Sequence, residues 1–145
     1  MDLDELMARE AIRDLVARYN SGADGGRFDE VVQLFAPDAV MEVPSETLNG
    51  RDEIEGLFRR TQQRVLDARP SPGERQYVRH FTATLQIDVE SADAARSRCY
   101  YQVIMAHGLD HWGRYVDRYR RVDGVWRFAH RKVTTDGRTD RSVMA

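Results

Sequence analysis

Four histidines are the residues of this sequence best suited to proton transfer. They are His80, His107, His111 and His130. An imidazole titrates near neutral pH, so it can take a proton from a substrate or return one. His107 and His111 lie four residues apart, but in a predicted strand end and turn, so the helical spacing of a metal site is not expected. There is also no Gly-rich phosphate loop, Gly-x-Ser-x-Gly turn or Cys-x-x-Cys pair. We predict no metal site.

Each candidate also has an ordinary structural explanation. Asp24 follows a predicted helix and precedes two glycines, where Asp commonly forms a turn or cap. Tyr19 lies on an apolar helix stripe, which favours core packing with the hydroxyl at the rim. His107 ends an alternating apolar stripe, a position typical of a structural histidine. The residues taken singly therefore do not identify a catalytic site.

His80 belongs to the stretch "YVRHFTATLQIDVE" at residues 77–90, which alternates with a period of two. Tyr77, Phe81 and Leu85 fall on a mostly apolar face, whereas His80 and Thr82 fall on the polar face. This alternation is typical of a strand with one buried face. On periodicity alone His80 would face solvent, unless the sheet curls so that its polar face lines a cavity.

The elements that must position these residues change type along the chain. Apolar stripes predict helices over 3–20, from Phe28 to the Pro37–Asp38 pair, and within 49–68. A short strand is predicted at 39–43. Alternation then predicts strands over 76–90, 95–107, 112–122 and 125–135, the last two joined by an Asp-Gly hairpin turn. Helices followed by an antiparallel meander predict an α+β domain whose curled sheet leaves a cavity at one end.

Composition limits the classes of partner. The 145 residues suit a single domain, residues 1–145. With 22 basic and 24 acidic residues the net charge is −2, so nucleic-acid binding is not expected. The single cysteine, Cys99, allows no intrachain disulfide. No signal peptide and no apolar run of about 18 residues is seen, so we expect a cytoplasmic protein that does not bind membranes.

Three segments in register resemble one known family, the SnoaL-like branch of the nuclear transport factor 2-like superfamily. They are "IRDLVARYNSGADGGRFDEVVQLFAPDAVMEV", "RHFTATLQID" and "GRYVDRYRRVDGVWRFAHRKV", and the resemblance covers about residues 5–135. It implies a cone-shaped α+β barrel, with three N-terminal helices packed in a strongly curved mixed or antiparallel sheet that encloses a pocket. It also implies a homodimer or homotrimer formed through the open sheet face.

The resemblance implies site residues as well. Dehydratases of this family, such as scytalone dehydratase and bile-acid dehydratase, pair an Asp after the first helix with a His on a strand; here Asp24 and His80 match. A second pocket His and a Tyr five residues before the Asp match His107 and Tyr19. The implied activity is a cofactor-independent dehydration of a small hydrophobic, cyclic or aromatic hydroxy-carbonyl compound. The substrate-binding residues would be Val16, Phe28, Val43, Phe58, Tyr101, Val103, Met105 and Tyr115.

The sequence also departs from the family pattern. Two tyrosines that hold a water in scytalone dehydratase match Ala23 and Val43 here, and its pocket asparagine matches Tyr115. The carboxylic acid that steroid isomerases place in an oxyanion hole has no equivalent. Two alternatives therefore stay open: a ketosteroid-isomerase-like or polyketide-cyclase-like enzyme that uses the same histidine, and a ligand-binding module without catalysis.

Overall fold

The protein is described by a computed structural model that covers residues 1–144. Helix α1 (Leu3–Asp24) begins after Asp2, whose side chain accepts a hydrogen bond from the backbone N–H of Glu5 at 2.9 Å. It ends before two glycines, because Gly26 has a φ of +72°, which only glycine adopts without strain. The predicted helix over 3–20 is confirmed and continues for four more residues, which puts Asp24 at its last position.

Two further helices follow, as predicted. Helix α2 (Phe28–Gln33) is short, and helix α3 (Gly50–Asp67) buries Ile54 and Phe58 on one side. None of the described helices is both long and apolar enough to cross a membrane.

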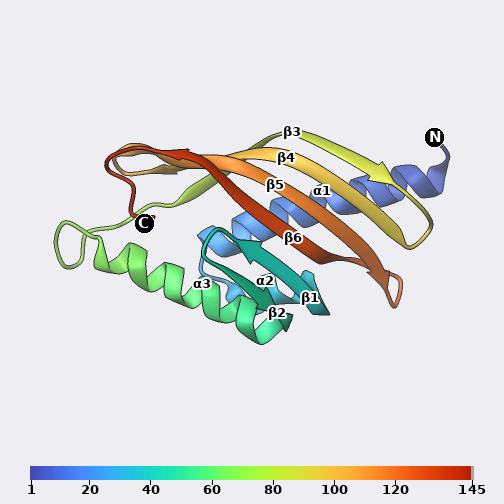
Figure 1. The fold of residues 1–145 in the computed structure, drawn as a ribbon, viewed down its shortest axis with the longest axis horizontal. Coiled ribbons are helices and arrows are strands. Elements are labelled where there is room, and N and C mark those ends of the chain that lie inside the picture. Colours follow the sequence, from blue (N-terminus) through green and yellow to red (C-terminus); the bar gives the residue numbers. More distant parts are fainter. Residues whose placement is uncertain (145) are drawn as a thin grey trace.

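The six strands form one mixed sheet (Figure 1) in the order β2-β1-β6-β5-β4-β3. Strands β1 and β6 are parallel, and all other neighbours are antiparallel. The sheet does not close into a barrel, because β2 and β3 remain at its edges. The strands are β1 (Phe35–Val43), β2 (Glu46–Asn49), β3 (Arg79–Val89), β4 (Ala94–Met105), β5 (Gly108–Val122) and β6 (Val125–Arg138).

The prediction for residues 34–49 was wrong in two respects. Pro37 and Asp38 do not end the second helix, which stops at Gln33; they lie within β1. The carbonyl of Leu34 accepts a hydrogen bond from the backbone N–H of Phe128 in β6 at 2.8 Å. The chain therefore pairs with β6 directly after α2 ends. In addition, residues 46–49 form a short strand paired with β1, for which the sequence pattern predicted no strand.

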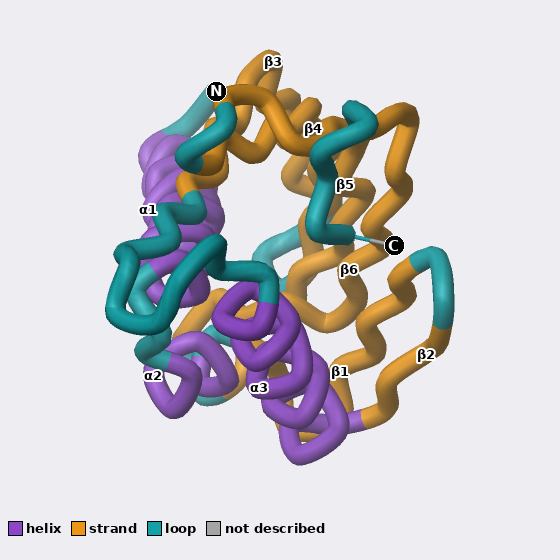
Figure 2. The backbone as a smooth tube through the Cα atoms, turned by 90° about the vertical axis from the view of Figure 1, so that its left-hand side faces the viewer, coloured by secondary structure: helices purple, strands orange, loops and turns teal. Residues whose placement is uncertain are grey.

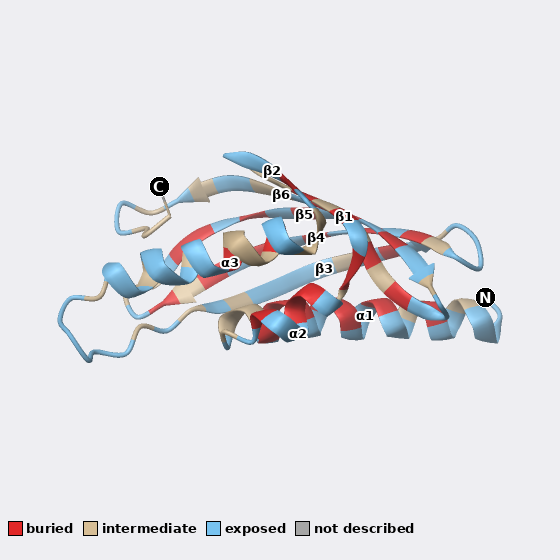
Figure 3. Cartoon of the chain, turned by 90° about the horizontal axis from the view of Figure 1, so that it is seen from below, coloured by how far each residue is buried: buried red, intermediate tan, exposed pale blue. Residues whose placement is uncertain are grey.

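The helices lie on one side of the curved sheet. Figure 3 shows α1 beneath β3 and α3 in front of the strands, with buried residues along α1. Helix α1 contacts β3, whereas α3 contacts β1 and β2 at the opposite edge. In Figure 2 α1 lies at the left and α3 at the bottom, and the strands curve from β3 beside α1 around to β1 and β2 beside α3. The side chains at this end define the candidate site described below.

A β-bulge in β3 decides which face His80 occupies. Ala83 pairs with Tyr100 and Gln86 with Arg98, so β3 contains one residue more than β4 over this interval. Thr84 in the bulge has a φ of +60°. After the bulge Ile87 is buried, as the alternation predicts, but before it the parity is reversed and His80 faces inward. The apolar face predicted for residues 77–83 therefore lies on the outside of the sheet, where Phe81 is 54% exposed.

A buried ion pair lies at the closed end of the interior. Arg131 and Asp117 are both completely buried and joined by two hydrogen bonds, at 2.8 and 2.7 Å. The guanidinium lies 4.1 Å from the ring centroid of Tyr19, 3.9 Å from that of Tyr115 and 4.5 Å from that of Phe128. This arrangement combines a bidentate pair with cation–π contacts. It forms a charged but enclosed floor behind the site.

Candidate functional site

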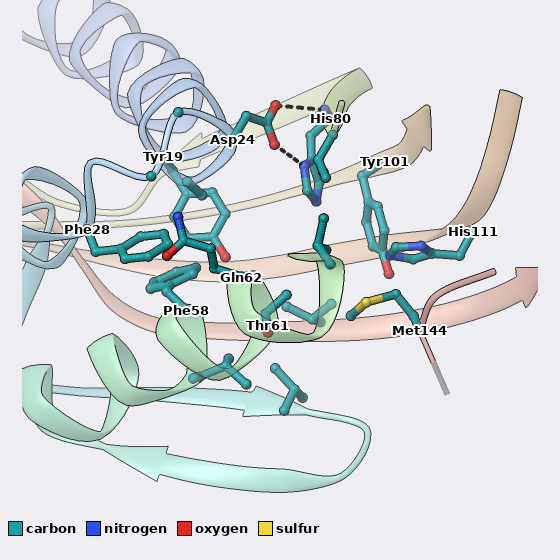
Figure 4. A pocket seen from close by; sticks show the side chains of 18 of the residues that line it. Tyr19, Asp24, Phe28, Phe58, Thr61, Gln62, His80, Tyr101, His111 and Met144 are labelled. Carbon is teal, nitrogen blue, oxygen red and sulfur yellow. Dashed lines mark hydrogen bonds and ion pairs between the residues drawn. The ribbon is translucent and has the colours of Figure 1, made fainter. Parts of the chain in front are cut away.

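A cavity of about 290 Å³ lies between the end of α1, helix α3 and the inner face of the sheet. Its walls are mostly apolar, with a few polar groups that converge on the interior, as in small-molecule sites. Figure 4 shows His80 and Asp24 on one side, and Thr61 and Gln62 of α3 opposite them. At this volume the cavity matches a small ligand.

Asp24 and His80 form a pair at the edge of this cavity. Nδ1 of His80 lies 2.6 Å from Oδ1 of Asp24, and the backbone N–H of His80 donates to Oδ2 at 2.9 Å. Both carboxylate oxygens are thus occupied by one residue of β3. Because a carboxylate only accepts, the ring proton belongs on Nδ1, which leaves the Nε2 lone pair free to act on a ligand. In Figure 4 the ring points from β3 into the cavity.

The pair also stabilises the negative charge of Asp24 at the end of α1. Asp24 is the last residue of α1, where the helix dipole is negative and a carboxylate is disfavoured. The Asp24 side chain is only 10% exposed, so solvent does little to stabilise its charge. Hydrogen bonds from His80 supply that stabilisation. The end of the helix and the bulged strand are therefore fastened together at the site.

Three tyrosines belong to the polar part of the lining: Tyr19, Tyr101 and Tyr115. Burial raises the pKa of all three hydroxyls, and that of Tyr115 most clearly. Each therefore stays protonated at neutral pH and can donate a hydrogen bond. Tyr115 stacks on Tyr101 with ring centroids 4.5 Å apart, and its hydroxyl donates to Asn20 at 3.4 Å.

Most of the residues proposed from the sequence lie around the cavity, and four do not. The cavity is lined by Tyr19, Asp24, Phe28, Val43, Phe58, His80, Tyr101 and Tyr115. Val16, Val103 and Met105 are instead buried in the core, because their side chains are covered by neighbouring core residues. His107 lies in the turn after β4, where its Nε2 is 3.0 Å from Oδ1 of Asp110 without hydrogen-bond alignment, and it does not reach the cavity.

Residues that sequence reasoning missed also line the cavity: His111, Gln62 and Met144. His111 is the fourth residue of β5, four residues after His107, and pairs with the inward-facing Val103. The predicted strand began at 112, whereas β5 begins at Gly108. A strand predicted from 108 would have placed His111 on the inward face. Gln62 lies on a polar stretch of α3 that gave no signal in the sequence.

No three His, Cys, Asp or Glu side chains within residues 1–144 are arranged to hold a metal ion. Cys99 is buried, and burial raises the pKa of its thiol to about 11. This thiol is therefore not a nucleophile at neutral pH. The groups able to move protons in the cavity are the imidazoles and the carboxylate of Asp24.

Comparisons with known structures agree with this fold. A protein from Novosphingobium aromaticivorans named "Putative Scytalone Dehydratase" is 23% identical, with a TM-score of 0.80 over 97% of this chain and 91% of its own. LinA is 22% identical, with a TM-score of 0.80 over 95% and 92%. An NTF2-like protein with a cystatin-like fold, also from Novosphingobium aromaticivorans, is 25% identical, with a TM-score of 0.74 over 99% and 97%.

No curated protein sequence matches the chain. A family model does: the SnoaL-like domain matches residues 4–132, nearly the whole of the described structure. This match includes α1, the bulged strand β3 and most of β6, and so every element that carries Asp24 and His80. The chain therefore belongs to the SnoaL-like domain family of the NTF2-like superfamily.

Proposed function

We propose that this protein is a cofactor-independent dehydratase-type lyase that acts on a small cyclic or aromatic hydroxy-carbonyl compound. The observation that carries the proposal is the Asp24–His80 pair, whose imidazole faces an otherwise apolar cavity. The family membership and the dehydratase and dehydrochlorinase names among the structural neighbours support a small-molecule site. They do not identify the substrate.

In the proposed reaction His80 takes a proton from the substrate and then returns it to the leaving hydroxyl. Nε2 takes the proton from the carbon next to the carbonyl, and the electron pair of that C–H bond moves toward the carbonyl oxygen to give an enolate. When the enolate collapses, its electron pair forms the C=C bond to the β-carbon as the bond from the β-carbon to its hydroxyl breaks. The hydroxyl leaves as water with a proton from the imidazolium of His80. Asp24 stabilises this imidazolium and fixes the ring orientation. A single histidine suffices when both reacting groups lie on one side of the ring.

Hydrogen-bond donors near the dyad would stabilise the developing enolate oxygen. Tyr19 is suited to this role, since its hydroxyl stays protonated and the residue lines the cavity, whereas the Tyr115 hydroxyl already donates to Asn20. The guanidinium of Arg131 packs directly behind both rings. Its positive charge favours electron density on these tyrosines during the reaction.

An isomerase or cyclase would use the same proton carrier. Among the described lining residues Asp24 is the one carboxylate, and it is already bonded to His80. A second, protonated carboxylic acid of the type used in steroid isomerases is therefore not part of this lining. This observation favours the dehydratase over the isomerase.

The experiment is a product analysis with two probes. 3-Hydroxy-1-tetralone loses water to give 1-naphthol, and 3-cyclohexenone isomerises to 2-cyclohexenone. We expect naphthol formation, reduced by about 10²–10⁴-fold in His80→Ala and by roughly 10-fold or more in Asp24→Asn. His130→Ala is the matched control, because His130 pairs with Glu42 at 2.7 Å outside the cavity. Near-full turnover in His80→Ala, with folding verified by circular dichroism, would contradict the dyad.

We also propose that copies of this chain associate through the outer face of the sheet. Phe81, Tyr100 and Trp112 lie on neighbouring strands there and are 54%, 57% and 37% exposed. An aromatic patch of this kind is typical of an interface. Sedimentation analysis should show a dimer or trimer that Phe81→Ser weakens and Leu6→Ser, an equally exposed residue on α1, does not. A monomeric wild type would refute the proposal.

A further inference from the structure

A second imidazole faces the cavity beside the proposed dyad. His111 pairs with Val103, which pairs in turn with His80, so the two histidines lie two strands apart on the same face. Neighbouring strands are about 4.8 Å apart, which separates the two Cα atoms by roughly 10 Å. Tyr101 lies between them, with its ring centroid 6.3 Å from His80 and 5.9 Å from His111.

Asp110 fixes the ring of His111 from behind. Its Oδ2 lies 2.7 Å from Nδ1 of His111, and the carboxylate is completely buried. The same carboxylate accepts hydrogen bonds from Ser142 Oγ at 2.7 Å and from the backbone N–H of Val143 at 3.1 Å. His111 is thus held as firmly as His80, and by a separate carboxylate.

The charge state of this second pair follows from its surroundings. Burial lowers the pKa of His111, and the nearby His80 lowers it further, although Asp110 acts in the opposite direction. The pKa of Asp110 is itself lowered, because bonds from Ser142, His111 and Val143 outweigh its burial. At neutral pH the pair is therefore a carboxylate and a neutral imidazole.

This charge state determines what His111 offers a ligand. Its proton lies on Nδ1, toward Asp110, so Nε2 keeps a lone pair. Nε2 forms no hydrogen bond within residues 1–144, while the side chain lines the cavity. In Figure 4 the ring lies beside Tyr101 and near Met144 at the cavity wall. Nε2 of His111 can therefore accept a hydrogen bond from a ligand.

We infer that His111 contacts the ligand and accepts a hydrogen bond from one of its hydroxyl groups, and that Asp110 is its positioning residue. This rests on the proposed function only in that the cavity must bind a cyclic molecule. The ligand is a ring compound with an alcohol, phenol or enol hydroxyl about as far from the group at His80 as the two imidazoles are from each other. A methyl ether in that place lacks the donor and also needs more room.

The test compares 2-naphthol with 2-methoxynaphthalene by fluorescence titration at pH 7.5. We expect the wild type to prefer the naphthol by about 3–10-fold, the range for one net hydrogen bond. In His111→Phe the preference should fall to about 1, whereas in His130→Phe it should stay. His111→Gln, which keeps an acceptor and is smaller, should retain part of the preference and covers the case that His111→Phe does not fold.

Asp110→Asn tests positioning by a spectroscopic signature. ¹⁵N NMR of the wild type should show His111 with its proton on Nδ1, and added 2-naphthol should shift Nε2. In Asp110→Asn the two tautomers should mix, and the hydroxyl preference should fall even if the variant remains folded. Ligand-induced shifts confined to His80 would overturn the inference.

The pH dependence is a further readout. The ionisable groups around His111 are Asp110 on β5, His80 on β3, Tyr101 on β4, His107 in the turn and Arg138, its partner on β6. Protonation of His111 at low pH converts Nε2 to a donor, so the preference for naphthol should disappear. A preference that persists in His111→Phe refutes the role of His111. Preference without dehydration of 3-hydroxy-1-tetralone refutes only the proposed function.

Discussion

The interior contains charged pairs at both ends, and they are built differently. At the closed end Arg131 and Asp117 are fully buried and surrounded by aromatic rings. At the open end the His80 and Asp24 side chains keep 22% and 10% of their exposure. The first pair uses a guanidinium, which stays charged at any physiological pH, and the second uses an imidazole, the side chain that most often transfers protons in enzymes. The first pair stabilises the architecture, whereas the second faces the cavity.

The comparison predicts the largest loss of stability for the closed end. Asp117→Asn leaves the Arg131 guanidinium buried without its counterion, which costs about 3–5 kcal/mol. Urea unfolding measures the loss. Replacing both residues with apolar ones, Asp117→Leu with Arg131→Met, should restore much of it, because no buried charge is left. A single variant that loses less than about 1 kcal/mol would show that the pair is not structural.

At the open end, substitution should change the stability little and the reaction rate strongly. His80→Gln should change the free energy of unfolding by no more than about 1–2 kcal/mol, since the backbone N–H of residue 80 still donates to Asp24 and the amide of Gln can replace the ring donor. Its dehydration rate should nevertheless fall by about 10²–10⁴-fold. Urea unfolding and the 1-naphthol assay on the same preparation compare the two effects. A His80→Gln variant that loses several kcal/mol of stability and yet keeps its dehydration rate would contradict this prediction.

A smaller effect is expected from the second pair on acidification. The pKa of His111 is lowered in the folded protein, so the unfolded chain binds more protons between that pKa and the free value of about 6.5. Stability is therefore highest above pH 6.5 and declines as the pH falls through the folded pKa. Unfolding free energies at pH 7.5 and 5.5 should differ less in His111→Gln than in the wild type. An equal difference would remove His111 as the cause.

The smallest change concerns Thr84. Its φ of +60° is strained for a β-branched residue, at a cost of about 1–3 kcal/mol. Glycine removes that strain but adds about 0.5–1 kcal/mol of backbone entropy. Thr84→Gly should thus be neutral or stabilising by roughly 1–2 kcal/mol, and Thr82→Gly on the same strand should destabilise. Thermal unfolding of both variants decides the point, and destabilisation by Thr84→Gly would contradict it.

The sequence predicts the class of fold well because most elements have strong local patterns. The helices and the last four strands follow from periodicity and turn residues. The strand at 39–43 was also predicted, but its early start at Phe35 was not, because that end of β1 is set by pairing with β6, a contact distant in sequence. Resemblance pointed to Asp24 and His80, which line the cavity, and to His107, which does not. The register that brings His111 inward depends on where β5 begins, and propensity does not fix that position.

The bulge at Thr84 has a practical consequence for engineering. It adds one residue, and that residue decides which surface of the protein the imidazole serves. A site grafted onto another sheet with Asp24 and His80 alone, without the extra residue, would present His80 to the solvent and Phe81 to the ligand. In comparisons between relatives, a one-residue insertion or deletion at this point of β3 likewise exchanges a cavity wall for an outer surface. The transplantable unit is therefore the pair together with its bulge.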